Sequence, residues 1–361
     1  MSGVVLRSAR RSAVLAVAVS LSVLTVAGCS GSSDQGSASS DQSSPVPGGS
    51  LKGQTITVYS GQHEQTVSTL VKDFRARTGI TAKVRSGDEA ELANQILTEG
   101  PASPADVFFA ENPPALTTLE NKGMLAKADS AALSAVPSAD SSAKGDWVGV
   151  SAREAAFVYN TSKLQAAKAP SSVKDLTDPA WKGKLGVAPS ETDFTPIVTR
   201  MIKAEGHDAA KSWLEGLKAD SKVYGSNEDL VNAVNRGEVE GGVIDHYYWY
   251  RLRDEQGAAG THSALGYFKQ GDPGALVDVS GAAVLSHGKH QAAAQAFLAY
   301  LTSKPAQQII ATSESYEYPL AAGVKNAKVS RALADSGSVA RPGDLGDGKE
   351  ALDLLKSVGL L

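Results

Sequence analysis

Residues 54–110 have the sequence QTITVYSGQHEQTVSTLVKDFRARTGITAKVRSGDEAELANQILTEGPASPADVFFA. Apolar and polar residues alternate over residues 54–59, which predicts a β-strand, and residues 66–78 have the spacing of an amphipathic helix that ends at Gly79. The same signals continue with a strand at 80–84, a helix at 89–98 and a strand at 105–110. This alternation of strands and helices predicts an α/β fold built on a mostly parallel sheet.

The α/β pattern continues along the rest of the chain. We expect two extended stretches within 147–159, strands at 184–188, 241–244 and 276–285, and helices at 193–205, 209–217, 228–236 and 291–301. In parallel α/β sheets, ligands bind beyond the carboxyl ends of the strands. The functional residues are therefore expected in the loops that follow the strands ending near Tyr59, Ala110, Ala188 and Ile244.

The composition limits the classes of protein that this chain can belong to. The 361 residues, 42% hydrophobic and 20% charged, are enough for about two domains. The formal net charge is −4 and no basic stripe occurs, so nucleic acid is not an expected partner. A single cysteine excludes an internal disulfide and any cysteine-rich zinc or iron–sulfur site.

The N-terminus has the features of an export signal. Arg7, Arg10 and Arg11 precede an apolar run at 12–27, which is shorter than a membrane span but has the length of a signal-peptide core. The run ends in Val-Ala-Gly-Cys29, which resembles the bacterial lipobox and implies cleavage before Cys29 and lipidation of its thiol. An ordinary secretory signal with a chance cysteine is the alternative interpretation.

This interpretation divides the N-terminal part of the chain. Residues 1–28 are the expected lipoprotein signal peptide, and residues 29–51 are the lipidated Cys29 and a flexible Ser/Gly linker, too poor in apolar residues to fold. The folded body would then be anchored by lipid on the outer face of the cytoplasmic membrane.

Four residues in the expected loops are candidate metal ligands: His63, Glu111, Tyr247 and Tyr248. One imidazole, one carboxylate and two phenols suit a hard, highly charged cation. A phenol ionises only near pH 10, so tyrosines bind a metal at neutral pH only when the metal is acidic enough to displace their protons. Ferric iron meets this condition, whereas magnesium and calcium do not.

Each of these residues also has a structural interpretation. His63 could be a surface residue that forms hydrogen bonds, and Glu111 could begin a helix, where the backbone dipole favours a carboxylate. The aromatic residues 247–250 could pack in the core or stack on a sugar. The residue types alone therefore leave the metal site as one of several hypotheses.

Three segments resemble signature segments of the bacterial ferric-ion-binding proteins: Ile56-Thr57-Val58-Tyr59-Ser60-Gly61-Gln62-His63, Pro104-Ala105-Asp106-Val107-Phe108-Phe109-Ala110-Glu111 and Tyr247-Tyr248-Trp249. These proteins are the extracytoplasmic solute-binding components of iron ABC transporters, and the likeness extends over nearly all of the folded chain. The resemblance implies that His63, Glu111, Tyr247 and Tyr248 bind Fe³⁺. It also implies a membrane permease as partner, no enzymatic activity, and a monomer.

The resemblance further implies residues that would hold an accompanying anion. Asn112 and Asn227 match amides of the family that contact the anion. Phosphate-binding members have Ser-Gly-Ala where this chain has Glu191-Thr192-Asp193, and Asp245 replaces an asparagine. These carboxylates would repel phosphate. We therefore expect Glu191, Asp193 or Asp245 to take the place of the anion, or a smaller anion such as carbonate to bind beside Arg153.

The resemblance implies a two-lobed fold of the type II periplasmic-binding-protein kind, with mostly parallel sheets flanked by helices and a hinge between the lobes. The expected division is residues 52–150 plus about 277–330 for lobe one, and residues 151–276 plus about 331–361 for lobe two. His63 and Glu111 would lie in lobe one and both tyrosines in lobe two. Metal binding would therefore close the cleft.

Three other functions remain as alternatives. Relatives of this fold bind polyamines, thiamine, organophosphonates or sulfate. A pocket for an organic cation could be lined by two aromatic and three acidic residues: Trp249, Tyr250, Glu191, Asp193 and Asp245. An enzyme is not expected, because no G-x-S-x-G elbow, Walker loop or G-x-G-x-x-G run occurs and the second histidine of a zinc-protease helix is missing after His63-Glu64. A structural envelope protein with a degenerate site is the third alternative.

Overall fold

The structure is a computed structural model that describes residues 51–338 and 341–361. The predicted signal peptide, Cys29 and residues 29–50 of the linker lie outside the described residues. No helix in the described part of the chain has the length and apolar character needed to cross a membrane.

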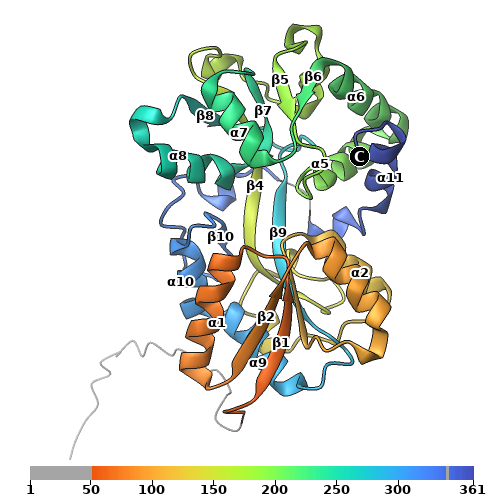
Figure 1. Cartoon of the computed structure of the whole chain (residues 1–361), viewed down its shortest axis with the longest axis vertical. Helices are drawn as coiled ribbons and strands as arrows, with labels where there is room; N and C mark the ends of the chain where they lie inside the picture. The colour runs from red at the N-terminus through yellow and green to blue at the C-terminus, as the bar shows by residue number, and fades with distance from the viewer. Residues whose placement is uncertain (1–50, 339–340) are drawn as a thin grey trace, which may run out of the picture. The chain divides into compact units, whose positions relative to one another are not determined.

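A mixed sheet of ten strands runs through the described residues in the order β2-β1-β3-β9-β4-β7-β5-β6, and β8 and β10 pair with β4 (Figure 1). The strands are β1 (Thr55–Ser60), β2 (Thr81–Ser86), β3 (Val107–Ala110), β4 (Val148–Asn160), β5 (Leu185–Val187), β6 (Ser221–Val223), β7 (Gly241–Asp245), β8 (Ser263–Gly266), β9 (Val277–Val284) and β10 (Tyr318–Pro319). Strand β1 is parallel to β2 and β3, and β5 is parallel to β6 and β7. The sheet is antiparallel where β9 and β4 join these two sets.

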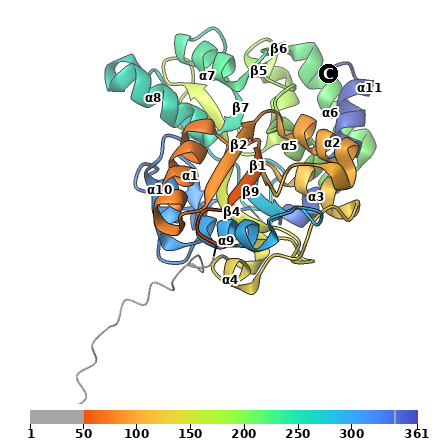
Figure 2. The ribbon, with the colours of Figure 1, turned by 60° about the horizontal axis from the view of Figure 1, so that its bottom comes forward.

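The helices cover both faces of this sheet. They are α1 (Glu64–Thr78), α2 (Glu89–Glu99), α3 (Pro113–Asn121), α4 (Ser130–Leu133), α5 (Phe194–Glu205), α6 (His207–Asp220), α7 (Asn227–Arg236), α8 (His246–Gly260), α9 (Gln291–Leu301), α10 (Lys304–Thr312) and α11 (Lys349–Ser357). Figure 2 shows α1 and α10 on one side of β1 and β2, with α2 and α3 on the other side. The alternation predicted for β1 explains this arrangement, because Ile56 and Val58 pack with Phe74 of α1 whereas Tyr59 packs with Ile96 of α2.

Strand β4 is one continuous strand of 13 residues, where two separate extended stretches were expected. Its first part, up to Glu154, pairs with β9, and its second part, from Ala155, pairs with β7 and β8. Every residue of β4 is buried, including the polar residues Ser151, Arg153 and Glu154 in its middle, which divide its apolar sequence into two stretches. Its pairing with β9 shifts register between Gly149 and Ser151. The strand therefore connects the β1–β3 set to the β5–β7 set and places its central residues between them.

Candidate metal centre

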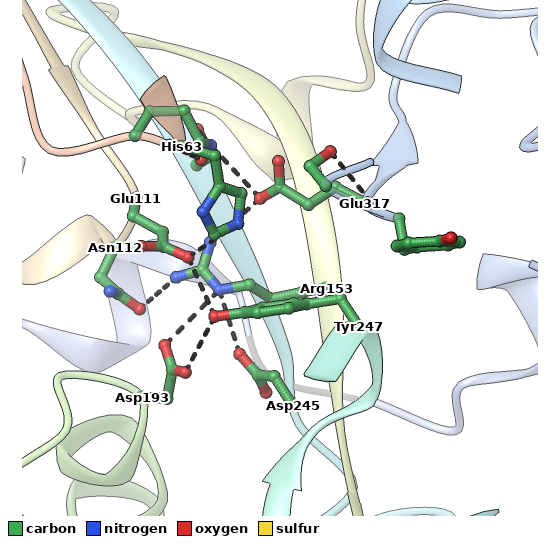
Figure 3. A network of polar contacts seen from close by, with 12 residues as sticks. His63, Glu111, Asn112, Arg153, Asp193, Asp245, Tyr247 and Glu317 are labelled. Atoms are coloured by element: carbon green, nitrogen blue, oxygen red, sulfur yellow. Dashed lines mark hydrogen bonds and ion pairs between the residues drawn. The ribbon is translucent and has the colours of Figure 1, made fainter. Parts of the chain in front are cut away.

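The predicted ligands come together where β1, β3 and β7 end (Figure 3). His63 precedes α1, Glu111 follows β3, and Tyr247 lies in the first turn of α8, which starts directly after β7. Glu111 Oε1 lies 3.3 Å from His63 Nε2 and 3.2 Å from the Tyr247 hydroxyl, which donates to it. The ring of Tyr248 packs against that of Tyr247, with 4.2 Å between the centroids. The structure thus brings together four residues that span 186 positions of sequence.

Burial and nearby charges set the protonation of this cluster. Burial, Arg251 and Arg153 lower the pKa of His63 well below its usual value, so the imidazole is neutral and its Nε2, which has no hydrogen-bond partner, can donate a lone pair. Burial, Asp193 and Glu111 raise the pKa of Tyr247 and of Tyr248 well above 10. Both phenols therefore stay protonated until a strongly acidic cation displaces their protons.

A completely buried arginine, Arg153 of β4, lies beside the cluster. Its Nε donates to Asp245 over 3.1 Å and an Nη donates to the Asn112 side chain. Burial opposes its charge, but acidic neighbours raise the pKa of Arg153 well above its usual value. The carboxylates within 4 Å of this guanidinium are Asp193, Asp245, Asp278 and Glu317. One guanidinium cannot offset the charge of four carboxylates, so the net charge of the site favours binding of a cation.

The three acids expected near an anion have different partners. Asp193 accepts hydrogen bonds from the Tyr247 hydroxyl (3.2 Å) and from Asn227 Nδ2 (3.3 Å), and burial and Glu111 raise its pKa to about 6. Glu191 accepts from the backbone N–H of Asn227 at the start of α7, and burial raises its pKa to about 7. Asp245 contacts Arg153 instead. Of the three, Asp193 forms the hydrogen bond to a predicted ligand.

Two buried glutamates of the site were not predicted. Glu89 of α2 accepts from the backbone N–H groups of Glu111 (2.7 Å) and Asn112 (2.8 Å) and from Asn112 Nδ2 (2.8 Å). Burial and Glu111 raise the pKa of Glu89 to about 8, although the donors from Asn112 oppose this rise. Glu317, just before β10, offers a ligand atom that lies within 4.8 Å of those of His63 and Glu111. Glu89 lies three residues after the end of β2, as His63 does after β1, but the loop after β2 was not among those expected to hold functional residues. Glu317 follows a helix, so the rule for the ends of strands did not locate it.

Comparison with known proteins places the chain in a family. Residues 69–335 match the family model described as bacterial extracellular solute-binding protein. The chain belongs to this family. This solute-binding protein is 38% identical over 308 residues to the Fe(3+)-binding periplasmic protein of Serratia marcescens, covering 85% of this chain and 91% of that protein.

Solved structures agree with the family. Iron-bound HitA from Pseudomonas aeruginosa matches with a TM-score of 0.81 and 40% identity, covering 85% of this chain and 99% of HitA. The Trichodesmium protein IdiA (FutA) in complex with iron and citrate matches with a TM-score of 0.74 and 28% identity, covering 84% of this chain and 99% of that chain. These matches confirm the predicted relationship to ferric-ion-binding proteins and the type II periplasmic-binding-protein fold.

In this solute-binding protein, the candidate centre is held by contacts between the two strand sets. The Tyr247 hydroxyl bonds to Glu111, and Asn112 Nδ2 donates to Thr192 Oγ1 over 3.3 Å. Glu111 and Asn112 follow β3, whereas Thr192 follows β5 and Tyr247 follows β7. Side chains from both sets therefore meet around the same small volume.

Proposed function

We propose that this protein is an extracytoplasmic ferric-iron-binding protein that captures Fe³⁺ between two lobes and delivers it to an ABC transporter permease. The observation that carries the proposal is the convergence of an imidazole, a carboxylate and two buried phenols, with Glu111 Oε1 3.3 Å from His63 Nε2 and 3.2 Å from the Tyr247 hydroxyl. The names of the relatives, an Fe(3+)-binding periplasmic protein and iron-bound HitA, support the same ligand.

His63, Glu111, Tyr247 and Tyr248 are the ligands in this proposal. Because the pKa of each phenol lies well above 10, the cation must release two strongly held protons before it can bind. Fe³⁺ is acidic enough to do so and is a hard cation that prefers oxygen donors. The two phenolates and the Glu111 carboxylate then supply three negative charges to a 3+ ion.

Asp193 takes the place of the exogenous anion. Its hydrogen bond to the Tyr247 hydroxyl, 3.2 Å long, places a carboxylate oxygen next to a ligand. A phosphate dianion in the same place would be repelled by Asp193, Asp245 and Glu111. Carbonate held by Arg153 is the alternative for this position. Phosphate coordinated to iron in a crystal of the loaded protein would contradict both assignments.

The lobe boundaries and the attachment to the membrane belong to the same proposal. Residues 52–150 plus about 277–330 form lobe one, and residues 151–276 plus about 331–361 form lobe two. The course of β4 and β9 between the strand sets supports this division. Ligands from both lobes can bind the ion at the same time only in the closed form, so ion binding favours that form. The permease recognises the closed form, and no chemical turnover is needed. Lipidated Cys29 holds the monomer on the outer face of the cytoplasmic membrane.

A visible absorption titration of the purified protein with ferric citrate tests the function. We expect an orange-red phenolate-to-iron band that weakens or shifts in Tyr247→Phe and Tyr248→Phe. Tyr300→Phe is the matched control, because Tyr300 bonds to Asp73 of α1, away from the cluster, and its loss should leave the band unchanged. If wild-type protein shows no band under any loading condition, the acidic pocket instead binds an organic cation such as a polyamine, or thiamine; an organophosphonate would have to overcome the same acids.

A further inference from the structure

We propose that Glu317 is a further ligand of the bound ferric ion, so that the protein completes the coordination with three donors from each strand set. This inference rests on the proposed function. Glu317 lies between α10 and β10, and the next residue, Tyr318, pairs with Ala152 of β4. This position brings the carboxylate to His63 and Glu111 from the side opposite Asn112 (Figure 3).

Three buried polar atoms on neighbouring side chains of this cluster have no hydrogen-bond partner. They are His63 Nε2, Arg153 Nη1 and Glu317 Oε2. Glu317 is 1% exposed, its Oε1 accepts from Gln62 Nε2 over 3.3 Å, and the 3.7 Å from Oε1 to Arg153 Nη1 exceeds a hydrogen bond. Leaving a buried carboxylate oxygen without a partner is costly. A cation held by the Glu317 carboxylate and by His63 Nε2 would offset the buried charge of Glu317 and give His63 Nε2 a partner.

The distances suit an octahedral ion. With metal–ligand bonds of about 2.1 Å, neighbouring octahedral donors lie about 3 Å apart and opposite donors about 4.2 Å apart. The Glu111 carboxylate lies 3.3 Å from His63 Nε2 and 3.2 Å from the Tyr247 hydroxyl, and that hydroxyl lies 3.2 Å from Asp193, as neighbouring donors do. The ligand atoms of Glu317, His63 and Glu111 all lie within 4.8 Å of one another, which allows neighbouring or opposite positions.

This arrangement divides the donors equally between the strand sets. His63 and Glu111 follow β1 and β3, and Glu317 belongs to the segment that pairs with the first part of β4. Asp193, Tyr247 and Tyr248 follow β5 and β7. Two phenolates and three carboxylates carry more negative charge than Arg153 and a divalent ion can offset, so a trivalent ion is favoured. No exogenous anion is needed when both sets contribute three donors.

Replacing Glu317 tests the inference in buffer free of phosphate and carbonate. Glu317→Gln keeps the size of the side chain but removes its charge. Iron that has lost an anionic donor attracts electrons more strongly, so the phenolate-to-iron band should move to longer wavelength. At least tenfold less citrate should then remove the iron. Glu317→Asp keeps the charge near Arg153 but withdraws the oxygen by one methylene, and it should change both readouts in the same direction.

The matched control is Glu154→Gln. Glu154 is another glutamate of 1% exposure, and it pairs with Arg331 over 2.9 Å instead of facing the ligands. This variant should lose stability while the band and the citrate resistance stay at the wild-type values. The inference is overturned if Glu317→Gln, or Glu317→Asp should the first variant not fold, has the band and citrate resistance of wild type. A wild-type protein without a band would overturn the proposed function itself.

Discussion

Glu89 holds the backbone that carries Glu111, so we expect Glu89→Gln to lower both the stability of the protein and its affinity for iron. Glu89 Oε1 accepts from Asn112 Nδ2, and Asn112 cannot turn its amide around because its oxygen accepts from Arg153. In the variant, either the new amide group faces Asn112 Nδ2 or it faces the backbone N–H groups of Glu111 and Asn112. The first orientation leaves one buried donor without its acceptor and the second leaves two, at a cost of about 1–3 kcal/mol for each.

Thermal unfolding of the iron-free protein and competition with citrate for the loaded protein measure this effect. Glu91→Gln is the control, because Glu91 lies exposed on the same helix. The control should match wild type in both measurements. A Glu89→Gln variant as stable as wild type would show that the bonds from Glu89 to residues 111 and 112 do not stabilise the loop.

Iron binding should depend steeply on pH because both tyrosines hold their protons in the iron-free protein. Release of two phenol protons changes the affinity about 100-fold per pH unit near neutral pH. His63 adds no proton there, since its pKa lies well below its usual value, whereas Asp193, with a pKa of about 6, adds one at lower pH.

Competition with a chelator of known protonation, between pH 5 and pH 8, measures this slope. Tyr247→Phe should reduce the slope by one proton, to about tenfold per pH unit. Retention of iron that does not change down to pH 5 would contradict phenolate ligation.

The residues of the site differ in how visible they are in the sequence. His63, Glu111 and Tyr247 each follow a strand with a clear pattern, so the rule for the carboxyl ends of strands located all three. Glu317 follows α10 and precedes a strand of two residues, which is too short to show a period. Its neighbour Tyr316 has a left-handed backbone (φ 57°), a conformation that the sequence Ser-Tyr-Glu-Tyr-Pro does not signal.

At the scale of elements, β7 positions the tyrosines because α8 begins immediately after it. Gly242 of β7 has no space for a side chain: a Cβ there would lie 2.6 Å from the Gly186 carbonyl oxygen and 2.9 Å from Leu230. We expect Gly242→Ala to push β7 away from β5, to destabilise the protein by about 1–3 kcal/mol and to lower the affinity for iron.

Urea unfolding and the iron titration check this expectation, with Gly225→Ala as control. A Cβ at Gly225 would meet only Asp229 Oδ2, at 4.0 Å, so this variant should behave as wild type. If the destabilised Gly242→Ala protein binds iron with wild-type affinity, the packing of β7 does not determine where α8 places the tyrosines.

Helix α1, which buries one face, was predicted to within two residues of its observed bounds, Glu64–Thr78. Helix α9 was predicted at its observed bounds, Gln291–Leu301, although most of its residues are buried. The start of α8 was not predicted as a helix, because His246, Tyr247, Tyr248 and Tyr250 are all buried and no polar face alternates with an apolar one. The antiparallel pairing of β9 and β4 was also not predicted, since a period of two is the same for either direction.

At the scale of the whole molecule, several buried acids make the iron-free protein dependent on pH. Burial is the main cause that raises the pKa of Asp278 and of Glu317 to about 7, that of Asp193 to about 6 and that of Asp245 well above its usual value. In the unfolded chain these groups titrate near pH 4. Between about pH 4 and pH 8 the folded protein therefore binds more protons than the unfolded chain, and its stability falls as the pH rises.

The iron-free and iron-loaded proteins should accordingly respond to pH in opposite ways. As the pH rises, each proton that the folded form binds in excess of the unfolded chain lowers the free energy of unfolding by about 1.4 kcal/mol per pH unit. The Tm of the iron-free protein should therefore fall by about 2–4 °C per unit between pH 5.5 and 8. Iron replaces these protons, so the gain in Tm on loading should grow over the same range. Differential scanning calorimetry measures both curves, and Asp278→Asn, which removes one buried acid, should flatten the iron-free curve. An iron-free Tm that rises from pH 5.5 to 8 would show that the buried acids are ionised without the metal.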